Sequence, residues 1–71
     1  WDDVRFFLAM VRAGTVKGAA HALKVDPSTV TRRLASLEEE VGRLFERSGT
    51  TYSLTERGRT MRSSAERIES E

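Results

Sequence analysis

The chain has 71 residues, 38% hydrophobic and 32% charged, and its 12 basic and 11 acidic residues leave a net charge of +1. This composition is typical of one small globular domain and excludes a disordered or fibrous chain. The sequence contains no cysteine, which excludes disulfides and thiolate metal sites. A core of this size supplies only about 3–5 kcal/mol of stability, so we expect a partner chain or an attached domain.

Membrane and secretory segments are not indicated by the sequence. The longest apolar run, residues 6–11, is far too short to span a bilayer, and no signal-peptide pattern is present. We therefore expect no membrane partner and a cytoplasmic protein. Because the sequence begins at Trp1 rather than Met and ends at Glu71 in an unfinished helix, we also expect it to be part of a longer protein.

The first predicted helix opens at Asp2 and Asp3, since acids favour the positive end of a helix dipole, and ends at Gly14. Apolar residues at helical spacing form two stripes along it, one of Trp1, Val4, Leu8 and Val11 and a second of Phe6, Met10 and Ala13. A helix that is apolar on two sides is buried on two sides. In so short a chain, we predict that the second stripe, with Phe6 and Met10, meets a partner.

The second and third predicted helices are separated by a very short joint. Thr15 can cap the second helix, over residues 16–23, whose alanines let another helix approach closely. Asp26 followed by Pro27 begins the third, because a carboxylate caps the first turn and proline already has a helical φ. Apolar residues follow at intervals of four, three and four residues, at Val30, Leu34, Leu37 and Val41. This spacing predicts that the helix runs to residue 41, before Gly42.

A hairpin and a last helix complete the chain. Two short β-compatible runs, residues 44–47 and 52–54, flank a loop that contains Gly49 and predict a β-hairpin. Thr55 can cap the last helix. Small and apolar residues recur along this helix at intervals of three and four residues, the spacing of a helix that pairs with another. Met61, Ala65 and Ile68 are therefore candidate dimerisation residues.

The order helix, helix, helix, hairpin, helix predicts a mainly α fold, a winged helix-turn-helix. Residues 1–54 would form this domain, and residues 55–71 would begin a linker and dimerisation helix. Lys24 occupies a turn position where glycine is common, so we expect a small left-handed strain there. Small or apolar residues stand where the helix-turn-helix motif needs them, at Ala20, Leu23, Val25, Val30 and Leu34.

With Val30 turned inward, the opposite side of the third helix is small, hydroxylated and cationic. Such side chains suit a major groove, where hydroxyls bond phosphates or base edges and arginine bonds guanine. Glutamates at 38–40 would be repelled by phosphate, so we expect only the first half of the helix to enter the groove and the glutamates to form a solvated face. The candidate DNA-binding residues that this spacing gives are Ser28, Thr29, Thr31, Arg32, Arg33 and Ser36.

Further candidates lie outside this helix. Arg47, in the wing, can touch the DNA backbone or minor groove, or can pair with a neighbouring glutamate (Glu38 or Glu46). Lys17 and Thr15 can meet a phosphate through the start of the second helix, although Lys17 also fits a solvated lysine. The third helix alone fits a solvated surface helix, but the turn spacing and the hairpin favour DNA. His21 has no second ligand, so we predict no metal, cofactor or catalytic site.

These residues resemble the N-terminal domain of LysR-type transcriptional regulators. The matching segments are Phe7 and Val11, 13–16 with Ala19, Ala20 and Leu23, 25–34, 37–42, 44–47, and Leu54 and Thr55 with Gly58. The resemblance implies a dimeric, often tetrameric, regulator of bacterial transcription, with a ligand-sensing domain after residue 71. It places DNA contacts at Pro27, Ser28, Thr29, Thr31, Arg32, Arg33 and Arg47. The chain departs from the family's pattern in two places. Asp26-Pro27 stands where the family often has Ser-Gln at the start of the recognition helix, and the wing tip carries no positive charge.

We therefore predict sequence-specific binding of double-stranded DNA by a homodimer, with residues 27–36 in the major groove. The alternative is a winged-helix module that binds another protein through the same face. DNA binding that weakens steeply with salt would favour the first hypothesis.

Overall fold

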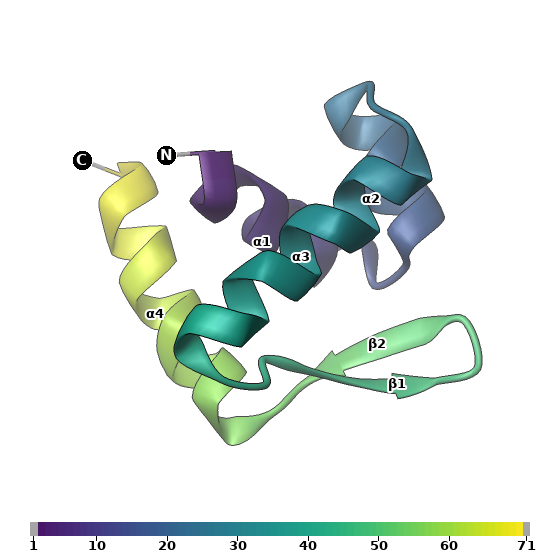
Figure 1. Cartoon of the computed structure of the whole chain (residues 1–71). Coiled ribbons are helices and arrows are strands. Elements are labelled where there is room, and N and C mark those ends of the chain that lie inside the picture. The colour runs from purple at the N-terminus through teal and green to yellow at the C-terminus, as the bar shows by residue number, and fades with distance from the viewer. Residues whose placement is uncertain (1, 71) are drawn as a thin grey trace.

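The structure, a computed structural model, describes residues 2–70. Its elements are α1 (Asp2–Ala13), α2 (Val16–Leu23), α3 (Pro27–Val41), β1 (Phe45–Ser48), β2 (Thr51–Leu54) and α4 (Glu56–Ser70) (Figure 1). The strands pair antiparallel, with Phe45 opposite Leu54 and Ser48 opposite Thr51. The predicted mainly α winged helix-turn-helix is confirmed, while its division at residue 54 stays a prediction. In the described part of the chain, no helix is long and apolar enough to cross a membrane.

Local chemistry at the cap residues sets the ends of the helices. Thr15 Oγ1 accepts the Gly18 N–H at 3.0 Å and begins α2, and the Asp26 carboxylate accepts the Ser28 N–H at 3.0 Å and begins α3. Lys24 ends α2 with a φ of 59°, which confirms the left-handed turn position. Its N–H donates to the carbonyls of Ala20 and His21 in the last turn of α2, and the following N–H, of Val25, donates to the Ala20 carbonyl at 3.0 Å.

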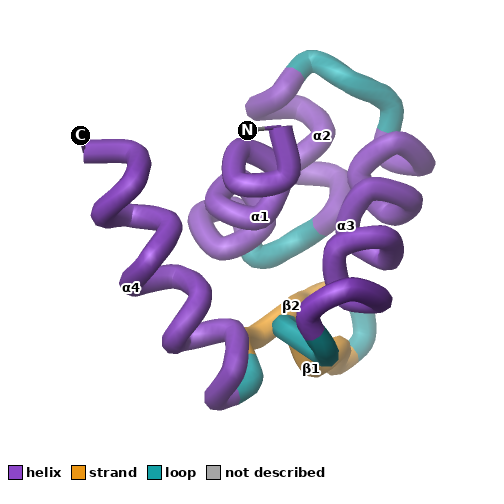
Figure 2. Tube along the Cα trace, turned by 60° about the vertical axis from the view of Figure 1, so that its left-hand side comes forward, coloured by secondary structure: helices purple, strands orange, loops and turns teal. Residues whose placement is uncertain are grey.

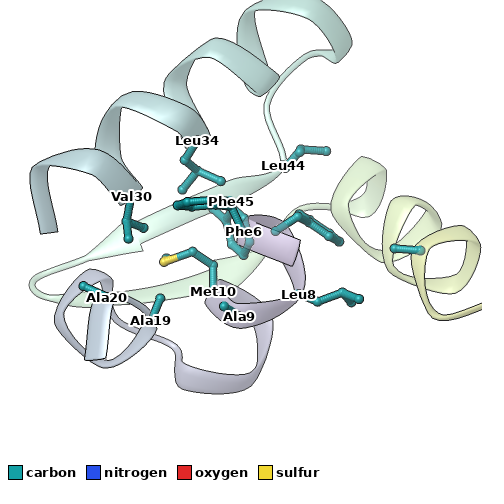
Figure 3. Close-up of a cluster of buried hydrophobic side chains, with 12 residues drawn as sticks. Phe6, Leu8, Ala9, Met10, Ala19, Ala20, Val30, Leu34, Leu44 and Phe45 are labelled. Atoms are coloured by element: carbon teal, nitrogen blue, oxygen red, sulfur yellow. The ribbon is translucent and has the colours of Figure 1, made fainter. Parts of the chain in front are cut away.

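The hydrophobic core lies where α1 meets α2, α3 and the hairpin (Figure 3). Val30 and Leu34 of α3 point from above toward α1, where Met10 lies below them. Val30 is completely buried and Leu34 is 6% exposed. Phe45 of β1 packs into the same core, and the centre of its ring lies 5.5 Å from the centre of the Phe7 ring. The core therefore fixes which side of α3 faces inward.

Phe6 and Met10 face the interior of their own chain, and the prediction that they meet a partner is wrong. Met10 is completely buried and Phe6 is 7% exposed, and both belong to the core cluster. The structure confirms that α1 is buried on two sides. The physical reason is that α1 is the central element, in contact with α2, α3, α4 and β2. Phe6 and Met10 of its second stripe are covered without a second chain, while Ala13 is exposed.

The start of α4 is held against the segment that leads into the hairpin. The Thr55 N–H donates to the Leu44 carbonyl at 3.0 Å, and Thr55 Oγ1 donates to the Arg43 carbonyl at 2.8 Å. The same hydroxyl oxygen accepts the Gly58 N–H at 3.0 Å, so the predicted cap at Thr55 is confirmed. Gly58 is buried here, and a Cβ on it would overlap the Leu44 carbonyl oxygen and lie 2.8 Å from Leu54 Cδ2.

We predict that Gly58→Ala destabilises the fold by about 2 kcal/mol, because overpacking against backbone outweighs the roughly 1 kcal/mol that alanine gains in a helix. Urea unfolding followed by circular dichroism measures the difference. Ser63→Ala, on an exposed position of the same helix, is the control and should leave stability unchanged or slightly raised. Equal stability of Gly58→Ala and the wild type would contradict the close approach of α4.

Candidate nucleic-acid interface

The outward side of the first half of α3 is an open ridge. Ser28 and Arg32 are exposed, as predicted, directly opposite the buried Val30 and Leu34. Figure 2 shows α3 along one side of the molecule, with α4 on the opposite side and the hairpin beneath the end of α3. We call this surface the α3 ridge and define it by its exposed residues, Pro27, Ser28, Thr31, Arg32, Ala35 and Ser36.

The two arginines of α3 differ in what they contact. Arg32 is exposed, and among residues 2–70 its side chain has no hydrogen bond or ion pair. Arg33 is half-buried on the shoulder of the helix, with Nη1 3.6 Å from Asp3 Oδ1 and the guanidinium 5.1 Å from the centre of the Phe6 ring. Arg33 therefore ties α3 to α1. No sequence signal indicated this contact, because Asp3 and Arg33 are distant in the chain.

The hydroxyls of the ridge are partly committed to their own helix. Ser28 Oγ donates to the Asp26 carboxylate, and Thr31 Oγ1 donates to the Pro27 carbonyl at 3.2 Å. The hydrogen bonds from the Ser28 side chain and backbone lower the pKa of Asp26 below its usual value of 3.8. Toward solvent, both hydroxyls therefore offer acceptor lone pairs rather than a proton. Thr29, also a candidate, is half-buried.

The wing arginine lies on the hairpin turn. Arg47 is exposed, its Nε donates to the Gly49 carbonyl at 2.8 Å, and its guanidinium lies 5.8 Å from the centre of the Tyr52 ring. Within the described chain it forms no ion pair with Glu38 or Glu46, the alternative considered from the sequence. Its charge is therefore fixed near the turn without being neutralised.

A groove joins the wing to the start of α2. It has a volume of about 320 Å³ and is lined by Thr15, Val16, Lys17, Arg47, Thr50 and Tyr52. The Tyr52 N–H donates to the Gly14 carbonyl at 2.8 Å and holds the hairpin beside the α1–α2 turn. Three candidates from two separate parts of the sequence, Thr15 and Lys17 in one and Arg47 in the other, thus share one surface, which the sequence did not predict. Two of them, Lys17 and Arg47, are exposed cations.

One of the three glutamates does not belong to a solvated face. Glu39 and Glu40 are exposed as predicted, but Glu38 is half-buried, and its Oε2 accepts the N–H groups of Leu44 at 2.7 Å and Phe45 at 3.0 Å. The prediction of a solvated face is therefore wrong for Glu38. Helical spacing could not reveal this, because both partners lie beyond the end of α3.

No metal-binding arrangement is found in the described residues: no group of three His, Cys, Asp or Glu could hold an ion. His21 is exposed on α2.

Comparison with known proteins agrees with this geometry. A family model described as "Bacterial regulatory helix-turn-helix protein, lysR family" matches residues 1–59. The chain belongs to this family. The family resemblance predicted from the sequence is thereby confirmed. The assignment of individual DNA-contacting residues stays a prediction.

Curated relatives of this lysR-family chain are transcriptional regulators. The HTH-type transcriptional activator IlvY of Salmonella typhimurium is 38% identical over 61 residues, which cover 84% of this chain and 21% of that protein. The HTH-type transcriptional regulator ClcR of Pseudomonas putida is 33% identical over 67 residues, covering 93% of this chain and 23% of that protein. The chain thus spans about a fifth of the length of these relatives.

Solved structures with the same fold include complexes with DNA. The CbnR DBD–DNA complex matches with a TM-score of 0.91 at 33% identity, covering 97% of this chain and 80% of that chain. The BenM DBD in complex with benA site 1 DNA also matches with a TM-score of 0.91, at 28% identity, covering 97% of this chain and 81% of that one. Full-length CbnR, described as a LysR-family transcriptional regulator, matches with a TM-score of 0.89.

We predict that Asp26→Ala lowers the melting temperature of this lysR-family domain near neutral pH and has little effect in strong acid. A carboxyl whose folded-state pKa is depressed stabilises the fold fully above its unfolded value, here 3.8, and that stabilisation is lost as the pH falls through the folded value. Thermal unfolding across the acid range measures the difference between variant and wild type. Asp26→Asn, which keeps a capping oxygen but does not titrate, is the control. A difference that persists unchanged far below pH 3.8 would contradict the assignment.

Proposed function

We propose that the chain binds double-stranded DNA sequence-specifically in bacterial transcription regulation, with the α3 ridge in the major groove and the hairpin on the backbone or minor groove. The observation that carries this proposal is the exposure of Ser28 and Arg32 on the helix that follows a tight left-handed turn, opposite a buried Val30. The relatives named above, a transcriptional activator and a transcriptional regulator, and the DNA complexes among the solved structures support it. The proposal includes no catalytic role and places the protein in the cytoplasm, where bacterial DNA lies.

Charge placement, rather than net charge, supports this orientation. The chain carries a net charge of only +1, but Arg32 lies within the α3 ridge, whereas Glu39 and Glu40 follow it toward the end of the helix. A duplex attracted to the first half of α3 meets a cation there and avoids the two carboxylates. Lys17 and Arg47, on the groove beside the wing, are suited to phosphates on the flank of the same duplex.

The ridge offers two kinds of base contact. The unpaired guanidinium of Arg32 can donate two hydrogen bonds to the O6 and N7 atoms of guanine. Ser28 has its proton committed to Asp26, so its oxygen accepts from an amino group of cytosine or adenine and is poorly suited to a phosphate. Arg33 is already held by Asp3 and Phe6, so we expect it to contribute less to base contacts than Arg32.

We predict that Arg32→Ala weakens binding to a duplex selected from a random-sequence pool by about 1–3 kcal/mol and relaxes the base preference at one position of each half-site. Fluorescence anisotropy and a repeated selection with the variant measure the two effects. Arg59→Ala, which removes an exposed arginine from α4, is the matched control and should leave base preference unchanged. Unaltered affinity and preference in Arg32→Ala would remove Arg32 from the interface, and no salt-dependent binding by the wild type would favour a protein-docking role.

We also propose that α4 pairs with a second copy of the chain. An apolar groove of about 250 Å³ lies open between α1, α3 and α4. Ile68 borders it and is 51% exposed, while Met61 is half-buried and Ala65 is 1% exposed. Ala65 therefore packs α4 against its own chain, whereas Ile68 and Met61 keep apolar surface that a partner can cover. A symmetric dimer would contact half-sites about 34 Å apart, or a multiple of that distance.

We predict that Ile68→Glu weakens self-association by about tenfold or more, because the apolar contact is lost in both copies of the dimer. Sedimentation equilibrium measures the monomer–dimer constant. Ser63→Glu introduces the same charge at an exposed position on another side of α4 and is the control. Equal dimerisation of both variants and the wild type would show that the chain associates through another surface.

A further inference from the structure

One carboxylate bridges the joint between α3 and the wing. Only residues 42–44 separate α3 from β1, and Gly42 takes a φ of +99° there. Oε2 of Glu38 accepts the N–H groups of Leu44 and Phe45 at 2.7 and 3.0 Å. One bond runs from the last turns of α3 to Leu44, the last residue of the joint, and the other to Phe45, the first residue of β1. They therefore link the direction in which the hairpin leaves to the end of the helix.

This joint lies between two groups of candidate DNA-binding residues. Arg32 and Ser36 precede Glu38 on the same helix, and Arg47 follows Phe45 by two residues on β1. Figure 1 shows the hairpin running from the joint back beneath α3. When α3 and the wing are held at a fixed spacing, a duplex bound by Arg32 meets Arg47 at a high effective concentration, so the two contacts strengthen each other. This gain in affinity falls when the spacing varies.

The bonds made by Glu38 are of the strong kind. Hydrogen bonds to an ionised carboxylate are roughly twice as strong as neutral ones, and this carboxylate is partly withdrawn from water. Glu39 and Glu40, its neighbours in sequence, carry the same charge but are exposed. The sequence Glu38-Glu39-Glu40 therefore contains one glutamate with a structural contact and two that serve as natural controls.

We propose that Glu38 is a positioning residue: by bonding Leu44 and Phe45, it sets the wing relative to the α3 ridge, so that Arg47 and Arg32 engage one duplex together. This proposal rests on the proposed DNA binding, but its geometric part does not. It makes a prediction opposite to simple electrostatics. Removing an acidic residue should tighten binding to a polyanion, whereas loss of Glu38 weakens it.

The geometric part is tested without DNA. The chain has no cysteine, so Ser36→Cys and Thr50→Cys, both at exposed positions, place spin labels on α3 and on the wing tip. Pulsed electron–electron double resonance then measures the distribution of distances between the two labels in the intact protein. In this background, Glu38→Ala broadens the distribution, Glu38→Gln broadens it less because a neutral oxygen still accepts, and Glu39→Ala leaves it unchanged.

An unchanged distribution in a folded Glu38→Ala protein overturns the proposal. If Glu38→Ala does not fold, the decision passes to Glu38→Gln, whose distribution must then be broader than that of the wild type. A role in stability alone would lower the melting temperature and leave the distance distribution of the folded protein unchanged. The spectroscopic result therefore separates positioning from stability.

The functional part is tested by a double-mutant cycle on a duplex selected from a random-sequence pool by the wild type. In the wild-type background, Arg47→Ala lowers the slope of log K against log salt by about 1. In the Glu38→Ala background, the same substitution changes the slope by less than half as much. Glu38→Ala alone weakens binding, and Glu39→Ala leaves it equal or tighter.

Equal effects of Arg47→Ala in the two backgrounds overturn the proposal, since the wing would then act independently of Glu38. Failure of the wild type to bind any duplex would instead contradict the proposed function. In that case the spin-label distances still decide whether Glu38 positions the wing.

Discussion

The burial of one side of α3 against α1 is the constraint on which the surface of this domain depends. Val30 and Leu34 lie in the core with Met10 below them, and each large aliphatic side chain contributes about 1.5–3 kcal/mol by its burial. In a chain this small, that is a large share of the total stability. Because residues of a helix advance by a fixed angle, the same burial turns Ser28 and Arg32 to solvent. The core therefore sets the orientation of the α3 ridge.

Polar side chains then fix where each element begins. Thr15, Asp26 and Thr55 cap α2, α3 and α4, and Glu38 bonds the start of the hairpin. In each case a side-chain oxygen satisfies a backbone N–H group that regular structure leaves without a partner. Helix ends and strand starts are consequently well defined, and a surface assembled from α3, the start of α2 and the wing keeps its shape.

Local signals made the fold predictable. The bounds of α2 and α3 match those expected from Thr15, Asp26 and Gly42, because capping acts within a few residues. The strands differ at three ends: β1 begins one residue later than predicted, at Phe45, and ends one residue later, at Ser48, while β2 begins one residue earlier, at Thr51. Pairing across the turn extends the ladder to Ser48 and Thr51, beyond the apolar residues. The exposure of Ser28 and Arg32 also followed from helical spacing alone.

Contacts between distant segments could not be predicted in the same way. Phe6 and Met10 are covered by other elements of their own chain, so their apolar character did not indicate a partner. Helical spacing places Arg33 on the shoulder of α3, but it could not show that Asp3 and Phe6 hold this side chain. Glu38 is distinguished from Glu39 only by backbone N–H groups beyond Gly42. Each of these differences depends on how α1, α3 and the hairpin come together.

The central claim, that the outward side of the first half of α3 meets the major groove, is tested most directly by nuclear magnetic resonance. Backbone amide shifts of the isotope-labelled protein are followed during titration with a duplex that it selects from a random pool. We predict that the shifted amides cluster at residues 28–36, with a second group in the hairpin around Arg47. Shifts confined to α4 and the apolar groove beside it, with residues 28–36 unaffected, would contradict the claim.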